Sequence, residues 1–217
     1  MGSLYISVIG ATRCEATEYA LAEEVGRLVA REGATLVCGG LGGVMEASAR
    51  GAKEAGGVTI GILPGHDRAE ANPYIDHALT TGMGHARNLA VVSSGDAVIA
   101  VGGRYGTLSE IGLAAKIGRP VVIVAGWRLE GEGATGGVWS AGSPGEAIAL
   151  VRAALDHPAL WREEPPGGAS RSDEPGCENH ARADLEREEP GHEEPGREEP
   201  GREKPGREKS PGRAAPV

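Results

Sequence analysis

Short apolar runs alternate with amphipathic stretches over the first 160 residues of the chain. In the amphipathic stretches, apolar side chains recur every three or four residues, as on one face of a helix. The stretch 15–31 shows this spacing, with Tyr19, Ala22, Val25 and Val29 on a common face. Helices are therefore predicted at 15–31, 44–55, 85–93, 107–117 and 143–156, and strands at 4–9, 34–38, 58–63, 77–81, 97–101 and 121–124.

The apolar runs are nearly continuous in Val, Ile and Leu, without the polar alternation that marks a half-exposed strand. Such strands are typical of a parallel sheet whose two faces are both covered by helices. The strand–helix order predicts an α/β fold, a doubly wound parallel sheet of Rossmann type with right-handed crossovers. Ligands of this architecture bind beyond the carboxyl ends of the strands. A longer connection, 65–76, is expected to form a lid or an interface.

The composition changes abruptly near Trp161. Beyond it, Pro, Gly and charged residues dominate, so the segment cannot bury enough apolar surface to offset its ordering entropy. Within it, 191–210 reads as the pentamers GHEEP, GREEP, GREKP and GREKS, whose Pro-Gly steps interrupt helix and strand alike. We expect a Rossmann-type nucleotide- or phosphate-binding domain over 1–160 and a disordered low-complexity tail over 161–217, with partner docking as an alternative role for the tail.

The net charge of −9 and the scarcity of aromatic residues, 3% of the chain, argue against several function classes. A sequence-independent grip on DNA or RNA needs clustered Lys and Arg, and base stacking needs aromatic side chains. No apolar run approaches the length of a membrane span, and the N-terminus has neither the length nor the charge of a signal peptide. The expectation is a cytoplasmic protein that binds neither nucleic acid nor a membrane.

Cysteine and histidine form no recognisable metal or disulfide pattern. The three cysteines, Cys14, Cys38 and Cys177, are odd in number and have no CxxC spacing. Cys38, at the end of a buried strand, is interpreted as a core residue, and Cys14 as an inert small side chain. No metal site is expected, and His85, in a glycine-flanked turn, is the one histidine singled out for attention.

Three glycine-containing loops, at 10–15, 39–45 and 102–110, lead from a predicted strand into the following helix. Glycine lets the backbone approach a ligand closely, and a helix N-terminus beyond it presents unpaired N–H groups. Together they are typical of an anion site, most often for phosphate. None of the loops contains GxGxxG or GxxxxGK(S/T), so neither a standard dinucleotide fingerprint nor a P-loop is predicted. The predicted ligand contacts are Gly10, Thr12, Gly39, Gly40, Gly42, Gly43, Met45, Gly102, Gly103, Tyr105, Gly106 and Thr107.

Two polar residues, Glu110 and Arg87, fit either a structural or a functional role. Thr107 and Glu110 have the spacing of a capping box, T-x-x-E, in which each side chain satisfies a backbone N–H of the helix start. The same spacing occurs at Thr12/Glu15 and at Ser143/Glu146. Arg87 is either a solvated surface residue or, early in a helix after a strand, a partner for an anion held between the loops.

These segments resemble the LONELY GUY / lysine-decarboxylase-like Rossmann superfamily, and most closely its branch of relatives of the molybdenum cofactor carrier protein. The resemblance covers residues 4–156. It rests on Gly102-Gly-Arg-Tyr-Gly-Thr-Leu-Ser-Glu110, which is similar to the family's PGGxGTxxE, and on the segments 39–45 and 84–87. Decarboxylation of lysine is not expected, because that reaction would need a pyridoxal phosphate lysine and the folded part contains only two lysines.

Hydrolase members of this superfamily cleave a nucleoside 5′-monophosphate to free base and ribose 5-phosphate. The resemblance implies that Glu110 lies by the ribose, where it stabilises oxocarbenium-like charge or orients water, and that Arg87 completes the catalytic pair. It implies no cofactor for hydrolysis and a homo-oligomer, dimer or tetramer. The residues that would hold the phosphate at the helix start are Gly102, Gly103, Gly106 and Thr107.

Two departures favour the carrier-like branch. Val101 stands where the motif has proline, and Asn88 follows the arginine where the hydrolases commonly have lysine. Loss of a cation weakens the binding of a monophosphate. The first hypothesis is therefore a carrier or binding protein for a phosphorylated small molecule, either a nucleotide or the molybdenum cofactor. The alternatives are a nucleoside 5′-monophosphate phosphoribohydrolase and, less favoured by the acidic composition, a DNA-processing Rossmann protein of the DprA type.

Overall fold

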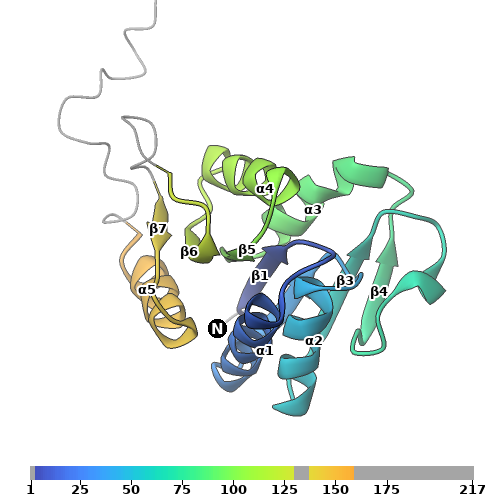
Figure 1. The fold of residues 1–217 in the computed structure, drawn as a ribbon, viewed down its shortest axis with the longest axis horizontal. Helices are drawn as coiled ribbons and strands as arrows, with labels where there is room; N and C mark the ends of the chain where they lie inside the picture. Colours follow the sequence, from blue (N-terminus) through green and yellow to red (C-terminus); the bar gives the residue numbers. More distant parts are fainter. Residues whose placement is uncertain (1–2, 130–136, 159–217) are drawn as a thin grey trace, which may run out of the picture. The chain divides into compact units, whose positions relative to one another are not determined.

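The computed structural model describes residues 3–129 and 137–158. These residues form one parallel sheet with helices on both of its faces, which confirms the predicted α/β class (Figure 1). The predicted tail, from residue 161 onward, lies outside the described residues. No helix within the described ranges is long and apolar enough to cross a membrane.

The sheet has seven strands in the order β4-β3-β2-β1-β5-β6-β7, and every pairing is parallel. The chain builds outward from β1 to one edge, then returns to the other side of β1, so the winding direction reverses between β1 and β5. The strands are β1 (Tyr5–Gly10), β2 (Thr35–Cys38), β3 (Thr59–Leu63), β4 (His77–Thr80), β5 (Ala97–Gly102), β6 (Val121–Gly126) and β7 (Val138–Ser140). The reversal places a crevice beyond the carboxyl ends of β1 and β5, where ligands of such sheets bind.

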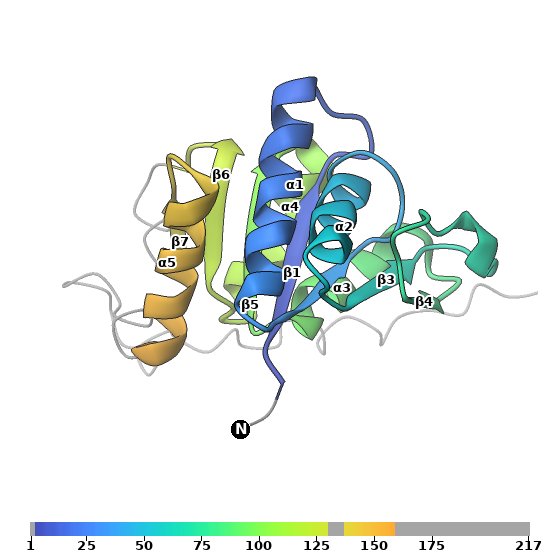
Figure 2. The ribbon, with the colours of Figure 1, turned by 90° about the horizontal axis from the view of Figure 1, so that it is seen from below.

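Helices α1, α2 and α5 cover one face of the sheet, and α3 and α4 cover the other (Figures 1 and 2). This division follows from the right-handed crossovers between parallel strands. The helices are α1 (Ala16–Arg31), α2 (Val44–Glu54), α3 (Arg87–Ser94), α4 (Tyr105–Lys116) and α5 (Pro144–Asp156), with short 3₁₀ turns η1 (Arg68–Glu70) and η2 (Gly84–Ala86).

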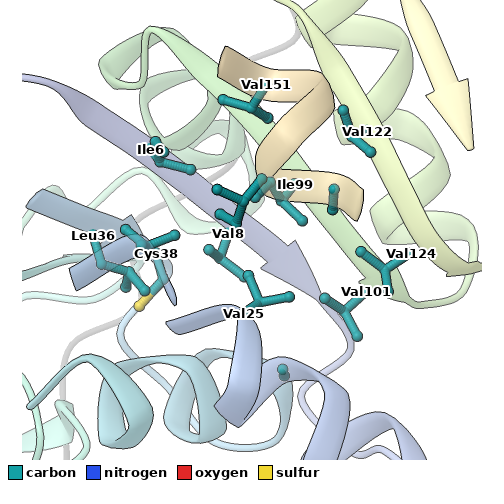
Figure 3. Packing of buried hydrophobic residues seen from close by; sticks show 14 of the residues in the cluster. Ile6, Val8, Val25, Leu36, Cys38, Ile99, Val101, Val122, Val124 and Val151 are labelled. Carbon is teal, nitrogen blue, oxygen red and sulfur yellow. The ribbon is translucent and has the colours of Figure 1, made fainter. Parts of the chain in front are cut away.

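Two apolar clusters, one on each face of the sheet, hold these layers together. Val8 of β1 and Ile99 of β5 pack against Val25 of α1 and Val151 of α5, all four fully buried (Figure 3). Side chains that point the other way from the same strands pack under α3 and α4. Each central strand therefore buries both of its faces, which explains the nearly continuous apolar runs in the sequence.

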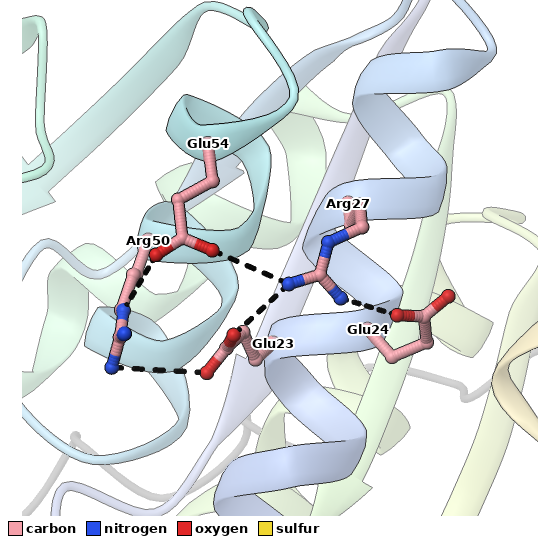
Figure 4. A network of polar contacts seen from close by, with 5 residues as sticks. All are labelled: Glu23, Glu24, Arg27, Arg50 and Glu54. Atoms are coloured by element: carbon pink, nitrogen blue, oxygen red, sulfur yellow. Dashed lines mark hydrogen bonds and ion pairs between the residues drawn. The ribbon is translucent and has the colours of Figure 1, made fainter.

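An ion-pair network joins α1 to α2 on their outer surface (Figure 4). Arg27 contacts Glu23, Glu24 and Glu54, and Arg50 extends the network to Glu23 and Glu54. The hydrogen bonds to these carboxylates raise the pKa of both arginines, and the pairing lowers the pKa of Glu54. Because these side chains are partly exposed, the network contributes little to stability.

Two of the three predicted capping boxes are wrong. Helix α4 begins at Tyr105, so Thr107 is its third residue and Glu110 lies in the second turn, away from the cap. Helix α1 is capped by Glu15, whose N–H donates to the Glu18 carboxylate at 3.1 Å, and not by Thr12. At α5 the Ser143 hydroxyl does accept from the N–H of Glu146, at 3.2 Å.

The connection 65–76 is tied to the second glycine loop. The side-chain amide of Asn72 donates to the carbonyls of Gly40, at 3.2 Å, and Leu41, at 2.9 Å, and its backbone N–H donates to Gly40 at 2.9 Å. The Asp76 carboxylate pairs with Lys53 at 2.6 Å and accepts from the N–H of Thr59 at 3.0 Å. The connection 65–76 therefore anchors the second glycine loop through Asn72, which is buried.

Candidate functional site

A cavity of about 440 Å³ opens where the strand order reverses. It is bounded by the ends of β1 and β2, the start of α4, and the turn that leads into α3. That volume lies within the range of about 300–1,000 Å³ that is usual for small-molecule sites. Its lining residues are Val8, Ile9, Gly10, Ala11, Thr12, Arg13, Gly39, Leu41, Met45, Pro64, Gly84, His85, Arg87, Asn88, Arg104, Gly106, Thr107 and Glu110.

Among the described residues, the three helix starts that follow the glycine loops differ in how many of their first amides have an acceptor within the protein. At α2, the first N–H, that of Val44, donates to the carbonyl of Ala11 at 3.1 Å. At α1, the helix start already carries the carboxylates of Glu15 and Glu18. Each helix N-terminus favours one negative group. The protein therefore occupies part of these two helix starts, although the N–H groups of Met45 and Glu46 in α2 have no backbone acceptor among the described residues.

At α4 the first helical N–H groups, those of Tyr105, Gly106 and Thr107, have no acceptor among the described residues. Gly106 and Thr107 line the cavity, so the start of α4, where the helix dipole is positive, lies at the cavity wall. The preceding turn depends on Gly102 and Gly103, which have φ of +57° and +100°, a conformation that side chains rarely adopt. This helix start is the part of the cavity best suited to a phosphate.

The guanidinium of Arg87 lies in the cavity wall without a partner. Arg87 is 7% exposed, and its Nε has no hydrogen-bond partner within the described residues. Burial lowers the pKa of Arg87, and the nearby Glu110 partly offsets this effect. A buried charge without a hydrogen-bonded partner is costly, and an anion bound in the cavity would reduce this cost.

Gly39, at the end of β2, makes room for this guanidinium. A Cβ added to Gly39 would lie 2.6 Å from both Nη2 of Arg87 and Sδ of Met45, and closer still to Nη1 of Arg87. A residue with any side chain there would displace Arg87. The approach of Arg87 therefore accounts for glycine at this position, which also lines the cavity.

Glu110 faces the cavity from α4 and is also 7% exposed. Its carboxylate forms no hydrogen bond or ion pair in the described part of the chain, although Arg87 lies near enough to act on it electrostatically. Burial raises the pKa of Glu110 to about 7, and the charge of Arg87 opposes this rise. Near neutral pH the carboxyl is therefore divided between its acid and its ionised form.

The rest of the lining combines an apolar floor with a cationic rim. Ile9 and Met45 are buried apolar side chains of the floor, which suits the flat face of a heterocycle. Arg13 and Arg104 are exposed at the rim, where they also line a neighbouring cavity of about 210 Å³ with Cys14. Burial, followed by the charge of Glu18, raises the pKa of the Cys14 thiol, so this cysteine is not activated.

The structure brings together part of the predicted set. Those that line the cavity are Arg87, Glu110, Gly10, Thr12, Gly39, Met45, Gly106 and Thr107. Gly40, Gly42, Gly43 and Gly102 support the loops without lining it, and Gly103 lines the neighbouring cavity. Tyr105 is 81% exposed and lies against the ring of Trp127, with centroids 5.7 Å apart.

Sequence reasoning missed several lining residues, Arg104 among them. Two residues, Arg104 and Tyr105, separate the paired glycines from Gly106, whereas the motif PGGxGTxxE has one. This segment is therefore one residue longer than the motif between the paired glycines and Gly106, and Arg104 is an additional cation at this point. Arg13 and Arg104 add positive charge to the cavity that Asn88 also lines. Among the described residues, no cluster of His, Cys, Asp or Glu forms a metal site.

Comparison with known proteins matches most of this chain to one family. Residues 3–148 match the model of the SLOG cluster4 family. An uncharacterized protein of Archaeoglobus fulgidus is 47% identical over 135 residues, which cover 59% of this chain and 89% of that protein.

Two solved structures are similar over nearly their whole length. The molybdenum cofactor binding protein of Rippkaea orientalis shares 38% identity, covers 71% of this chain and 99% of its own, and gives a TM-score of 0.67. The molybdenum cofactor carrier protein of Chlamydomonas reinhardtii shares 34% identity with the same coverages and a TM-score of 0.64.

Proposed function

The chain belongs to the SLOG cluster4 family, and from that premise we propose that it is a carrier for a phosphorylated small ligand, of which the molybdenum cofactor is the first candidate. A ligand-binding Rossmann-type protein is what the family and the fold support in general. The named cargo comes from the two relatives described above. A nucleoside monophosphate is the second candidate ligand.

The observation that carries this proposal is that the unpartnered guanidinium of Arg87 and the start of α4, whose first amides have no acceptor among the described residues, belong to the same cavity. Both offer hydrogen-bond donors into one cavity, and a phosphate monoester accepts from both at once. The apolar floor around Met45 accommodates a heterocycle beside it. The residues present thus fit a phosphorylated pterin or nucleotide that is held by its phosphate and whose ring lies on the apolar floor.

Equilibrium binding to a small panel tests this proposal. Molybdopterin, AMP and GMP are to be compared with adenosine and guanosine, which lack the phosphate. We expect at least one phosphorylated compound to bind at one site per chain and the nucleosides to bind far more weakly. If no phosphorylated compound binds, the proposal is wrong.

Arg87→Lys is the matching variant, because lysine keeps the charge but loses the planar fork. A hydrogen bond to a charged group contributes about 1.5–3 kcal/mol, so affinity should fall by about ten- to a hundredfold. Arg68→Lys, at an exposed site outside this cavity, is the control. Equal affinities for the two variants would exclude Arg87 as a phosphate ligand.

A phosphoribohydrolase is the second candidate function, and Glu110 favours it. Its carboxyl lies in the cavity near Thr107 and has a pKa of about 7, which suits proton transfer near neutral pH. Incubation with AMP should then release adenine, and Glu110→Gln should abolish the release. If the unmodified protein binds AMP without releasing base, the carrier function remains and the hydrolase function is excluded.

A further inference from the structure

The position of Glu110 creates an electrostatic problem for any phosphate bound in the cavity. Glu110 follows Thr107 by three residues on α4, so both side chains lie on the same face of the helix. Both line the cavity that Arg87 enters from α3. A phosphate held by the amides at the start of α4 and by Arg87 therefore lies beside the Glu110 carboxyl.

Two negative groups held side by side repel one another, and one of them then takes up a proton. The cost of protonating Glu110 is small, because burial has already raised its pKa to about 7. In its acid form the carboxyl donates a hydrogen bond to a phosphate oxygen, a short and strong charge-assisted bond. In its ionised form it would repel that oxygen.

The groups that surround Glu110 do not remove the repulsion between its carboxylate and a bound phosphate. Among the described residues, the charge that lowers the pKa of Glu110 is that of Arg87, and the two side chains form no ion pair. Arg13, His85 and Arg104 line the same cavity from the loop after β1, from η2 and from the residue before α4. Cys38 of β2 lies beside Arg87, and burial raises the pKa of its thiol to about 11, so it adds no charge.

We propose that Glu110 binds the ligand's phosphate as a neutral acid, so that capture of the ligand takes up one proton and release of the ligand returns it. This inference rests on the proposed function, since it presupposes a phosphate in this cavity. Its consequence is that the cargo is held more tightly at lower pH and released more readily as the pH rises.

The expected effect follows from proton linkage. Above about pH 7 the free protein must gain a proton to bind, so its affinity falls by up to about tenfold for each pH unit. Glu110→Gln carries a neutral side chain that still donates a hydrogen bond at every pH. At about pH 8 the variant should therefore bind about tenfold more tightly than the unmodified protein, and at about pH 6 the two should be similar.

Calorimetric titration of the full chain with AMP, at about pH 6 and about pH 8 and in two buffers of different ionisation enthalpy, measures the proton uptake directly. Ribose 5-phosphate is the companion probe, because it carries the phosphate without the N-glycosidic bond that a phosphoribohydrolase would cleave. The phosphate's own ionisation, with a pKa of about 6, affects all variants equally. Glu70→Gln, at an exposed site outside the cavity, is the matched control for the loss of one carboxylate.

We expect close to one additional proton taken up at about pH 8 by the unmodified protein and by Glu70→Gln, and none by Glu110→Gln. Equal proton uptake and equal pH dependence in all three proteins, with binding intact, would overturn this inference and leave the proposed function standing. If the unmodified protein binds neither AMP nor ribose 5-phosphate, this inference is overturned. If it does not bind molybdopterin either, the proposed function is overturned too. Should Glu110→Gln fail to fold, the proton count of the unmodified protein alone decides.

Discussion

Replacing Gly39 by alanine tests whether the close approach of Arg87 matters for the site. The added methyl group would overlap Nη1 and Nη2 of Arg87 and Sδ of Met45. The backbone of Gly39 itself is not left-handed, so the substitution introduces no backbone strain. Its effect therefore comes from the displacement of neighbouring side chains and above all of the guanidinium.

The magnitude has two parts. Overpacking a filled interior costs about 1–3 kcal/mol of unfolding free energy, and the flexible ends of Arg87 and Met45 place Gly39→Ala at the lower end of this range. A displaced guanidinium loses its hydrogen bonds to the ligand phosphate, each of about 1.5–3 kcal/mol. Affinity for a phosphorylated ligand should fall by ten- to a hundredfold, or about 1.4–2.8 kcal/mol.

Gly42→Ala is the control in the same loop. A Cβ at Gly42 would lie 3.6 Å from the carbonyl oxygen of Thr12 and 3.7 Å from Oε2 of Glu46, which are ordinary contacts. We expect its stability and its affinity to match those of the unmodified protein within about 0.5 kcal/mol. Urea denaturation and calorimetric titration measure both quantities. If Gly39→Ala binds as tightly as Gly42→Ala, Arg87 is not held in place for the ligand and the reasoning fails.

Three further predictions concern stability. Asn72→Ala removes two side-chain hydrogen bonds, to Gly40 and Leu41, and should lower the free energy of unfolding by about 1–3 kcal/mol. We also expect faster amide hydrogen exchange in the loop 39–43. Unchanged exchange would show that the connection 65–76 does not hold this loop. Because the pKa of Glu110 is raised on folding, its contribution to stability is fully present below about pH 4.5 and is lost as the pH rises through about 7. Glu110→Gln should therefore be more stable than the unmodified protein by up to about 3 kcal/mol at about pH 8 and equal to it at about pH 4. A constant difference in unfolding free energy across this pH range would contradict the burial of that carboxyl. Arg27→Ala should lower the melting temperature only slightly at low salt and not at all at high salt, and a large salt-independent loss would mean that the network of Figure 4 is not a surface ion-pair network.

The elements could be predicted from the sequence because each central strand is buried on both faces and each long helix has one apolar face. The strand β7 was missed because Val138–Ser140 is three residues long and carries no run of apolar side chains. The start of α4 was placed two residues late because T-x-x-E is typical of a cap, whereas here Glu110 turns inward one helical turn further on. The local pattern T-x-x-E does not distinguish a helix cap from a glutamate that faces a cavity, because the difference depends on the segments that surround the helix.

The composition of the site was harder to predict than its location. Glycines after strands indicated the carboxyl edge of the sheet, where the cavity lies, but they could not show that Ala11 accepts from the first N–H of α2 or that Glu15 and Glu18 cap α1. Nor could they show that Arg13 and Arg104 reach one rim from separate loops. These facts arise from the packing of distant segments, and one sequence carries no signal for them beyond the loops themselves.

The most direct test of the central claim is a crystal structure of the full chain with AMP or with whichever compound of the binding panel binds most tightly. The account predicts that the phosphate oxygens accept hydrogen bonds from the N–H groups of Gly106 and Thr107 and from the guanidinium of Arg87. A phosphate bound elsewhere, between Arg13 and Arg104 or at the start of α1, with Arg87 still unpartnered, would contradict it.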